Sequence, residues 1–345
     1  MENKKTFKIL SIDGGGIKGL YSAIILEHLE EEFCKKQGYS ISDYFDMICG
    51  TSTGGLIALA LSVKTPAGQI ANFYKKRGKD IFPNHSFFEK KLSAIKQLVV
   101  GGKYTNKVLR NELEAILGDK TMADAHNLLC IPSFNLTKSL PTVWKFPHKE
   151  GNYIRDAKIK MLDVALATSA APTYFPIHEI HPHGRFIDGG VWANNPTLCG
   201  VQEAIEFFIN QPLNQTGETL FDNLQVLSIS SVNKPSAQSL GGSLHKSFLD
   251  WQDKLFNPFF EGQTYFVDRF MTNAILKIYP NASYHRMPSP NLSPEQTNDI
   301  DLDKASEKSI KLLETLGSQM GYDYRSAKRE LVSPFFQQLK TYKTL

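Results

Sequence analysis

Cysteine is scarce in this chain, and the few cysteines are not grouped. Four occur among 345 residues, at Cys34, Cys49, Cys130 and Cys199, and no two of them form a Cys-x-x-Cys pair. Structural zinc sites and disulfide-stapled folds depend on closely spaced or framework cysteines. The sequence therefore indicates neither kind of site.

Long apolar runs and a strong excess of charge are also missing. No stretch of about 18 apolar residues suggests a transmembrane helix. The segment Met1 to Lys5 is polar and leads directly into a strand-like run, without the apolar core of a signal peptide. The net charge of +4 is too small to favour a nucleic acid polymer as partner. We expect a cytoplasmic protein, either soluble or peripheral to a membrane.

The chain alternates between strand-like and helix-like segments, with no internal repeat and no low-complexity linker. This alternation predicts an α/β fold with a mostly parallel central sheet sandwiched by helices. We expect a single domain over residues 1–345, with a core at about 7–232 and a C-terminal helical portion at 233–345 that begins with a polar loop at 233–243. The expected strands are 7–12, 45–49, 127–137, 185–188 and 224–232, and the expected helices are 17–36, 56–63, 160–169 and 301–316.

A glycine-rich loop follows the first strand and has two competing interpretations. Gly14-x-Gly16-x-x-Gly19 lies between a strand and a helix and so satisfies the dinucleotide-binding fingerprint. That fingerprint also needs an acid at the end of a second strand, whereas Glu30 to Glu32 lie inside the predicted helix. The alternative is an oxyanion hole, since consecutive glycines let backbone N–H groups face a developing alkoxide. We favour this alternative because a serine motif follows downstream.

The serine motif is Gly50-x-Ser52-x-Gly54, placed between a short strand and an apolar helix. This pattern is typical of a nucleophile elbow, a tight turn that exposes a serine hydroxyl. Small flanking residues are needed because the serine backbone is strained and its neighbours pack closely. The motif predicts Ser52 as a nucleophile.

The base that would activate Ser52 is less obvious. Nine histidines are available, and His178, His181 and His183 form a cluster in a turn-like segment. No Glu or His at helical spacing supports a metal site there. Asp188 is the better candidate, because it precedes Gly189-Gly190 at a predicted strand end and a buried aspartate can act as a general base.

The three motifs together, Asp-Gly-Gly-Gly-x-x-Gly, Gly-x-Ser-x-Gly and Asp-Gly-Gly in this order, resemble the patatin-like phospholipase family. Residues 167–176 and 193–196 also resemble segments of that family. The resemblance implies a patatin-like three-layer architecture and a Ser52–Asp188 dyad. It further implies an oxyanion hole around Gly14, Gly15, Gly16 and Lys18, with no metal and no cofactor. Lys18 stands where many members carry arginine, and lysine lacks the bidentate fork of arginine.

This family resemblance implies a lipid acyl hydrolase that cleaves fatty-acyl esters of membrane phospholipids. Within the family, the compact length is similar to bacterial phospholipase effectors that cyclic nucleotides switch on in anti-phage (CBASS) systems. The expected partners are then a phospholipid surface and a cyclic-nucleotide activator, and a homo-oligomer is left open. A constitutive acyl hydrolase and a non-enzymatic nucleotide-binding module that uses Gly14 to Gly19 remain alternatives.

Three further segments could meet lipid. Two are rich in aromatic residues, Phe82 to Val99 and Phe248 to Phe270, and one is basic, Lys75 to Lys79. Apolar stripes beside cations are typical of interfacial helices. Ordinary core packing would explain the aromatic segments equally well, and a solvated helix face would explain the basic one.

Overall fold

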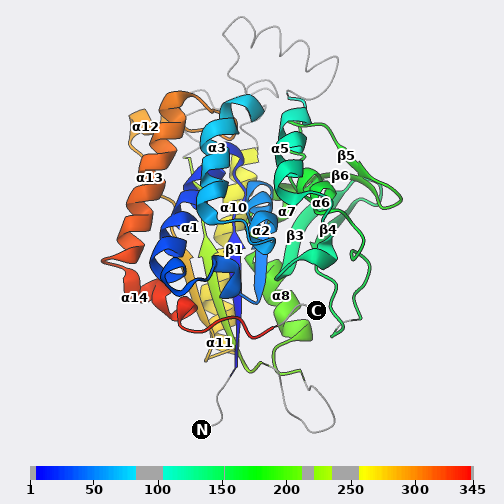
Figure 1. Ribbon diagram of the computed structural model, residues 1–345, viewed down its shortest axis with the longest axis vertical. Helices are drawn as coiled ribbons and strands as arrows, with labels where there is room; N and C mark the ends of the chain where they lie inside the picture. Colours follow the sequence, from blue (N-terminus) through cyan, green and yellow to red (C-terminus); the bar gives the residue numbers. More distant parts are fainter. Residues whose placement is uncertain (1–4, 83–103, 151, 212–220, 235–255, 343–345) are drawn as a thin grey trace, which may run out of the picture.

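The computed structural model describes residues 5–82, 104–150, 152–211, 221–234 and 256–342, which form a mostly parallel sheet covered by helices (Figure 1). The sheet has the order β5-β6-β3-β2-β1-β7-β8, with β4 paired to β3. The central strands β3, β2, β1, β7 and β8 are parallel. Strands β4 and β6 each pair with β3 antiparallel, and β5 pairs antiparallel with β6. This confirms the predicted fold class.

The strands come from all parts of the described chain. Their bounds are β1 Thr6–Ile12, β2 Met47–Gly50, β3 Leu128–Asn135, β4 Leu140–Lys145, β5 His178–Ile180, β6 Gly184–Asp188, β7 Asn223–Ile229 and β8 Ser283–Met287.

The helices follow the same chain order. They are α1 Gly19–Phe33, α2 Thr53–Ser62, α3 Ala67–Ile81, α5 Lys107–Leu117, α6 Met161–Thr168, α7 Gly190–Ala193, α8 Thr197–Phe207, α10 Phe256–Phe270, α11 Leu276–Ile278, α12 Pro294–Asp299, α13 Glu307–Arg325 and α14 Arg329–Val332.

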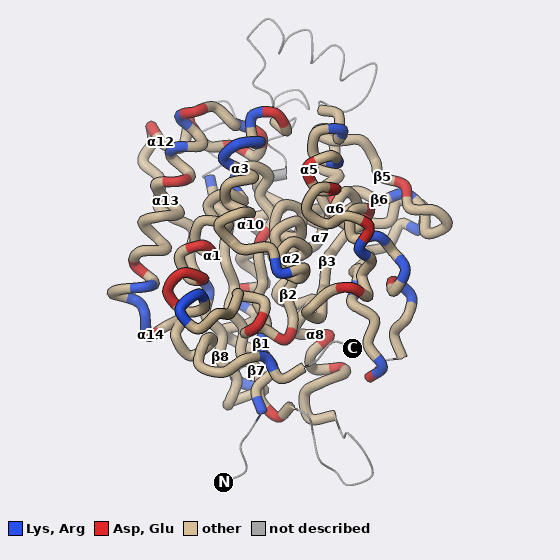
Figure 2. The backbone as a smooth tube through the Cα atoms, viewed as in Figure 1, with Lys and Arg blue, Asp and Glu red and all other residues tan. Residues whose placement is uncertain are grey.

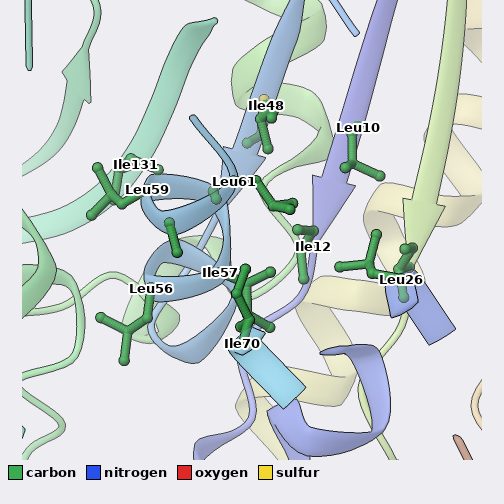
Figure 3. Close-up of a cluster of buried hydrophobic side chains, with 14 of the residues drawn as sticks. Leu10, Ile12, Leu26, Ile48, Leu56, Ile57, Leu59, Leu61, Ile70 and Ile131 are labelled. Atoms are coloured by element: carbon green, nitrogen blue, oxygen red, sulfur yellow. The ribbon is translucent and has the colours of Figure 1, made fainter. Parts of the chain in front are cut away.

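Opposite faces of the central strands are covered by α2 and α8. Successive residues of a strand point to opposite faces, so Leu10, Ile12 and Ile48 pack against the apolar side chains of α2 (Figure 3). On the other face, a Cβ added to Gly200 of α8 would lie 2.3 Å from Cys49 Sγ. This close approach brings α8 directly onto the sheet. Both faces are therefore covered, which explains why nearly every position of β1 and β7 is buried.

The C-terminal portion packs against the first helix and the sheet edge. The long helix α13 lies along α1 (Figure 1), and the two approach closely because a Cβ on Gly317 would already touch Ile24 at 3.0 Å. The helix predicted at 301–316 in fact begins at Glu307, where Ser306 caps it by accepting the Ser309 N–H at 3.1 Å, and it continues to Arg325. Of the loop predicted at 233–243, residues 235–243 lie outside the described residues.

None of the helices in the described ranges is both long and apolar enough to span a bilayer.

Candidate active site

Ser52 lies in a strained turn between β2 and α2. Its backbone has φ 53° and ψ −123°, a conformation that L-residues rarely adopt and that is found where strain serves a site. The turn depends on two glycines. A Cβ on Gly50 would lie 2.1 Å from the Gly54 carbonyl oxygen, and a Cβ on Gly54 would lie 2.2 Å from the Ile12 carbonyl oxygen. The structure thus places Gly50, Ser52 and Gly54 in the geometry of a nucleophile elbow.

Asp188 is the hydrogen-bond partner of this serine. The Ser52 hydroxyl donates to Asp188 Oδ2 at 2.6 Å, and the Gly190 N–H donates to Asp188 Oδ1 at 2.7 Å. Asp188 is only 4% exposed. Burial raises the pKa of its carboxyl to about 7, although the bonds from Ser52 and Gly190 oppose the rise. A carboxylate with a pKa near neutrality, in contact with the hydroxyl, has the properties of a general base.

The backbone N–H of Ser52 is held separately. It donates to Thr168 Oγ1 at 3.0 Å, and the Thr168 hydroxyl in turn donates to the Pro132 carbonyl at 2.6 Å. Thr168 ends α6, whereas Pro132 belongs to β3. The elbow is therefore anchored to two elements that sequence reasoning did not connect with it.

The glycine loop faces Ser52 and offers two backbone donors. Gly15 and Gly16 line the same cavity as Ser52. Among the described residues, neither N–H donates to a backbone carbonyl, whereas the Gly14 N–H already donates to the Asn194 carbonyl at 3.0 Å. Gly14 is instead required by packing, because its Cβ would lie 2.6 Å from Asn194 Oδ1. This arrangement leaves Gly15 and Gly16 as the candidate oxyanion donors.

The surroundings of Lys18 differ from those of Ser52. It is buried and does not line the cavity, and its charge interacts with Asp301 and Glu261. Burial lowers the pKa of the Lys18 ammonium, and the two carboxylates oppose that effect. Asp301 also pairs with Lys234 at 3.0 Å. Lys18 thus joins the glycine loop to the C-terminal portion.

A buried ion pair anchors the start of the glycine loop to β8. The Arg286 guanidinium donates to both carboxylate oxygens of Asp13, with Nη1 to Oδ1 at 3.3 Å. Its Nη1 also donates to Ser228 Oγ at 2.6 Å. Burial raises the pKa of Asp13, and Arg286 opposes that rise. Sequence reasoning did not identify Arg286, because no motif surrounds it.

The dyad opens into a largely apolar cavity, part of which is open to solvent. Such a lining suits a hydrocarbon chain, because apolar side chains offer few hydrogen-bond partners to a polar ligand. The apolar lining residues are Leu56, Tyr74, Ile81, Phe82, Leu109, Ala171, Pro172, Tyr174, Phe175, Val191, Phe260 and Leu302.

No histidine lines this cavity in the described part of the chain. His178 contacts Asp163 at 3.1 Å, and His285 contacts Tyr324 at 2.9 Å. His245 lies outside the described residues. Within the ranges that the structure covers, no group of three His, Cys, Asp or Glu side chains could hold a metal ion.

Glu30, one of the acids near the position that the dinucleotide fingerprint requires, makes hydrogen bonds elsewhere in the fold. Glu30 is buried in α1, and its carboxylate accepts the Ala67 N–H at 2.8 Å and the Ile41 N–H at 3.4 Å. It therefore satisfies the first N–H of α3, which would otherwise lack a partner. Glu30 accordingly has a structural role in joining α1 to α3.

The segments predicted to meet lipid divide into different environments. Phe82 and Phe260 line the cavity, and Phe259 and Phe266 of α10 are exposed. Residues 83–99 and 248–255 of these segments lie outside the described residues.

The basic run lies on α3, where Figure 2 shows its positive charges, and three of its side chains pair with acids. The pairs are Lys75 with Glu314, Arg77 with Asp80 and Glu112, and Lys79 with Glu307.

Comparison with known proteins gives a consistent result. Residues 10–198 match the family model described as "Patatin-like phospholipase". "Patatin-like protein 2" of Oryza sativa subsp. indica is 35% identical over 225 residues, which cover 60% of this chain and 55% of that protein. The chain therefore spans little more than half the length of that relative.

Two other relatives align over more of their length. "Patatin-like protein 2" of Arabidopsis thaliana is 31% identical over 90% of this chain and 82% of its own length. "cGAMP-activated phospholipase" of Vibrio cholerae serotype O1 is 29% identical over 97% of this chain and 95% of its own length.

Proposed function

The chain belongs to the patatin-like phospholipase family, whose members are acyl hydrolases, and from this premise we propose that it cleaves fatty-acyl esters of phospholipids with Ser52 as nucleophile and Asp188 as base. The observation that carries the proposal is the hydrogen bond of 2.6 Å from Ser52 Oγ to Asp188 Oδ2 at the wall of an apolar cavity. The cavity would hold the acyl chain while the head group stays in water.

In the acylation step, Ser52 Oγ attacks the ester carbonyl carbon and Asp188 accepts the hydroxyl proton. The N–H groups of Gly15 and Gly16 would donate to the oxyanion, a contribution of about 3 kcal/mol per donor in comparable sites. Collapse of the tetrahedral intermediate breaks the ester bond, and Asp188 returns the proton to the departing alcohol.

In the deacylation step, Asp188 accepts a proton from water, whose oxygen attacks the acyl-serine carbonyl. The second tetrahedral intermediate expels Ser52 Oγ, which regains the proton, and the fatty acid leaves. Since burial raises the pKa of Asp188 to about 7, one group can serve as base and acid in turn.

The test is active-site labelling with a matched serine. A fluorophosphonate probe should label the wild type on Ser52, and Ser52→Ala should lose both the label and ester hydrolysis. Ser169 lines the same cavity, but its hydroxyl donates to the Ala165 carbonyl at 2.7 Å, so Ser169→Ala should keep the label. Labelling that persists in Ser52→Ala would refute the assignment.

Activation by a cyclic nucleotide is the finer part of the proposal. It is supported by the alignment with the Vibrio cholerae protein named as a cGAMP-activated phospholipase, which covers 97% of this chain. In this role the protein would associate peripherally with the phospholipid surface once activated, as in anti-phage effectors. We expect cGAMP to raise the initial rate on phospholipid vesicles at least tenfold, equivalent to about 1.4 kcal/mol.

The same assay separates the alternatives. Initial rates would be measured on vesicles with a panel of cyclic di- and trinucleotides, and light scattering would follow the oligomeric state. Full activity in the bare protein would leave a constitutive acyl hydrolase. Thermal stabilisation by a nucleotide, without any Ser52-dependent hydrolysis, would instead favour the nucleotide-binding module.

A further inference from the structure

The single-turn helix α7, directly after the base, contacts two parts of the catalytic apparatus. Its first residue, Gly190, donates its N–H to Asp188 Oδ1 at 2.7 Å. Its last residue, Ala193, accepts the hydroxyl of Thr51 at 2.6 Å, next to the nucleophile Ser52. Helix α7 therefore fixes the base relative to the elbow.

The end of this turn also contacts the glycine loop. The Asn194 carbonyl accepts the Gly14 N–H at 3.0 Å, so the residue after α7 determines the position of the candidate oxyanion donors. A helix of one turn has little stability of its own, because nucleation costs more than so few hydrogen bonds return. External contacts must hold it in place.

One such contact comes from α10, in the C-terminal portion beyond residue 198. The Gln263 amide donates from Nε2 to the Val191 carbonyl at 3.1 Å, and its Oε1 accepts the Asn194 N–H at 3.1 Å. A single side chain thus bridges two backbone groups of the turn. Helices α10 and α7 pack together around this bridge, since a Cβ on Gly190 would meet the Phe260 ring at 3.1 Å (Figure 1).

We propose that Gln263 is a positioning residue for the hydrolysis reaction. By hydrogen-bonding to both Val191 and Asn194, it keeps α7 in the position where the Gly190 N–H donates to Asp188. The same contacts keep the Asn194 carbonyl within reach of the Gly14 N–H. Base and oxyanion donors are then aligned with Ser52 before substrate arrives. The inference rests on the proposed function, because positioning has meaning only if Ser52 and Asp188 hydrolyse an ester.

The experiment compares Gln263→Met with the wild type on a soluble p-nitrophenyl fatty-acyl ester, with active sites counted by complete fluorophosphonate labelling. Methionine fills similar volume but removes both hydrogen bonds. We expect kcat per labelled site to fall at least tenfold while KM changes less than twofold, since the lost alignment matters chiefly in the transition state. The control is Tyr265→Ala, a 67% exposed residue of the same helix, which should keep both constants.

The outcomes separate the two proposals. Ester hydrolysis in the wild type that does not depend on Ser52 would remove the proposed function and this inference with it. Ser52-dependent hydrolysis, with kcat per labelled site unchanged in Gln263→Met, would overturn the inference alone. An equal loss in Tyr265→Ala would also overturn it, because the effect would then be general to α10.

A second variant keeps the test informative if Gln263→Met does not fold. Gln263→Glu retains the acceptor for the Asn194 N–H but places a carboxylate oxygen against the Val191 carbonyl. We expect its kcat per labelled site to fall at least fivefold with little change in KM. Wild-type kcat in this variant would refute the positioning role.

Discussion

The substitution Asp188→Asn should abolish turnover and also raise the free energy of unfolding. The size of this stabilisation should depend on pH. The pKa of this carboxyl rises from 3.8 to about 7 on folding because the group is buried. Between these values the folded state keeps a proton that the unfolded chain has lost. The stability of the wild type therefore falls as pH rises through this window and levels off above it.

The size of the effect follows from the pKa shift. Each pKa unit corresponds to about 1.4 kcal/mol, so the ionised base costs the folded state about 4 kcal/mol above pH 7. Asn at this position does not titrate. Between pH 5 and pH 8 the free energy of unfolding of Asp188→Asn should thus rise relative to the wild type by about 2 to 3 kcal/mol.

Urea denaturation at several pH values measures this difference, and ester hydrolysis is assayed on the same samples. Asp119→Asn is the control, since the Asp119 side chain is 95% exposed and its difference from the wild type should hardly change over this range. In the wild type, kcat/KM should rise with pH around 7 as the base loses its proton. A stability difference between Asp188→Asn and the wild type that stays constant from pH 5 to pH 8 would refute the reasoning.

Three further changes test the surroundings of the dyad. Gly15→Ala would place a Cβ 2.1 Å from Ser231 Oγ, so kcat should fall at least tenfold with little change in KM, and steady-state kinetics showing a pure KM effect would contradict an oxyanion role. Arg286→Leu leaves Asp13 buried without its cation and should lower the free energy of unfolding by about 3 to 5 kcal/mol. Adding Asp13→Asn should recover most of this loss. If urea denaturation shows no recovery in the double variant, the ion pair is not the cause of the loss. Leu56→Trp fills part of the cavity and should shift preference toward shorter acyl esters, which a series of p-nitrophenyl esters measures; an unchanged chain-length profile would mean that the acyl chain lies elsewhere.

The sequence predicts the central strands β1, β2, β3 and β7, and it also predicts most of β6. β1 and β7 are mostly apolar and mostly buried because helices cover both sides of them, and such apolar runs are visible in the sequence. β8 was not predicted, since Ser283 to Met287 is a partly exposed edge strand whose side chains do not alternate in polarity. For the basic run Lys75 to Lys79 on α3, the sequence leaves open a lipid contact or a solvated helix face, and its ion pairs follow only from the tertiary structure.

Some residues of the site can be predicted from local sequence motifs, and others cannot. Ser52 and Asp188 are recognisable because each lies in a tight turn that requires neighbouring glycines, and these glycines are visible in the sequence. Arg286, Gln263 and Thr168 act through contacts between distant segments, and nothing in their immediate sequence distinguishes them from any other arginine, glutamine or threonine. Contacts of this kind can be identified only from the tertiary structure.

The position of β7 has a consequence for how the chain can be divided. β1 pairs with β7 over its whole length, from Thr6 to Ile12, yet the family match stops at residue 198, before β7 begins at Asn223. A fragment cut at that boundary would leave one side of β1 as an open, apolar strand edge, a template for aggregation. A series of C-terminal deletions should therefore lose soluble expression abruptly once β7 is removed. For expression work, strand pairing sets the useful boundary, which lies beyond residue 198, where the match to the family model ends.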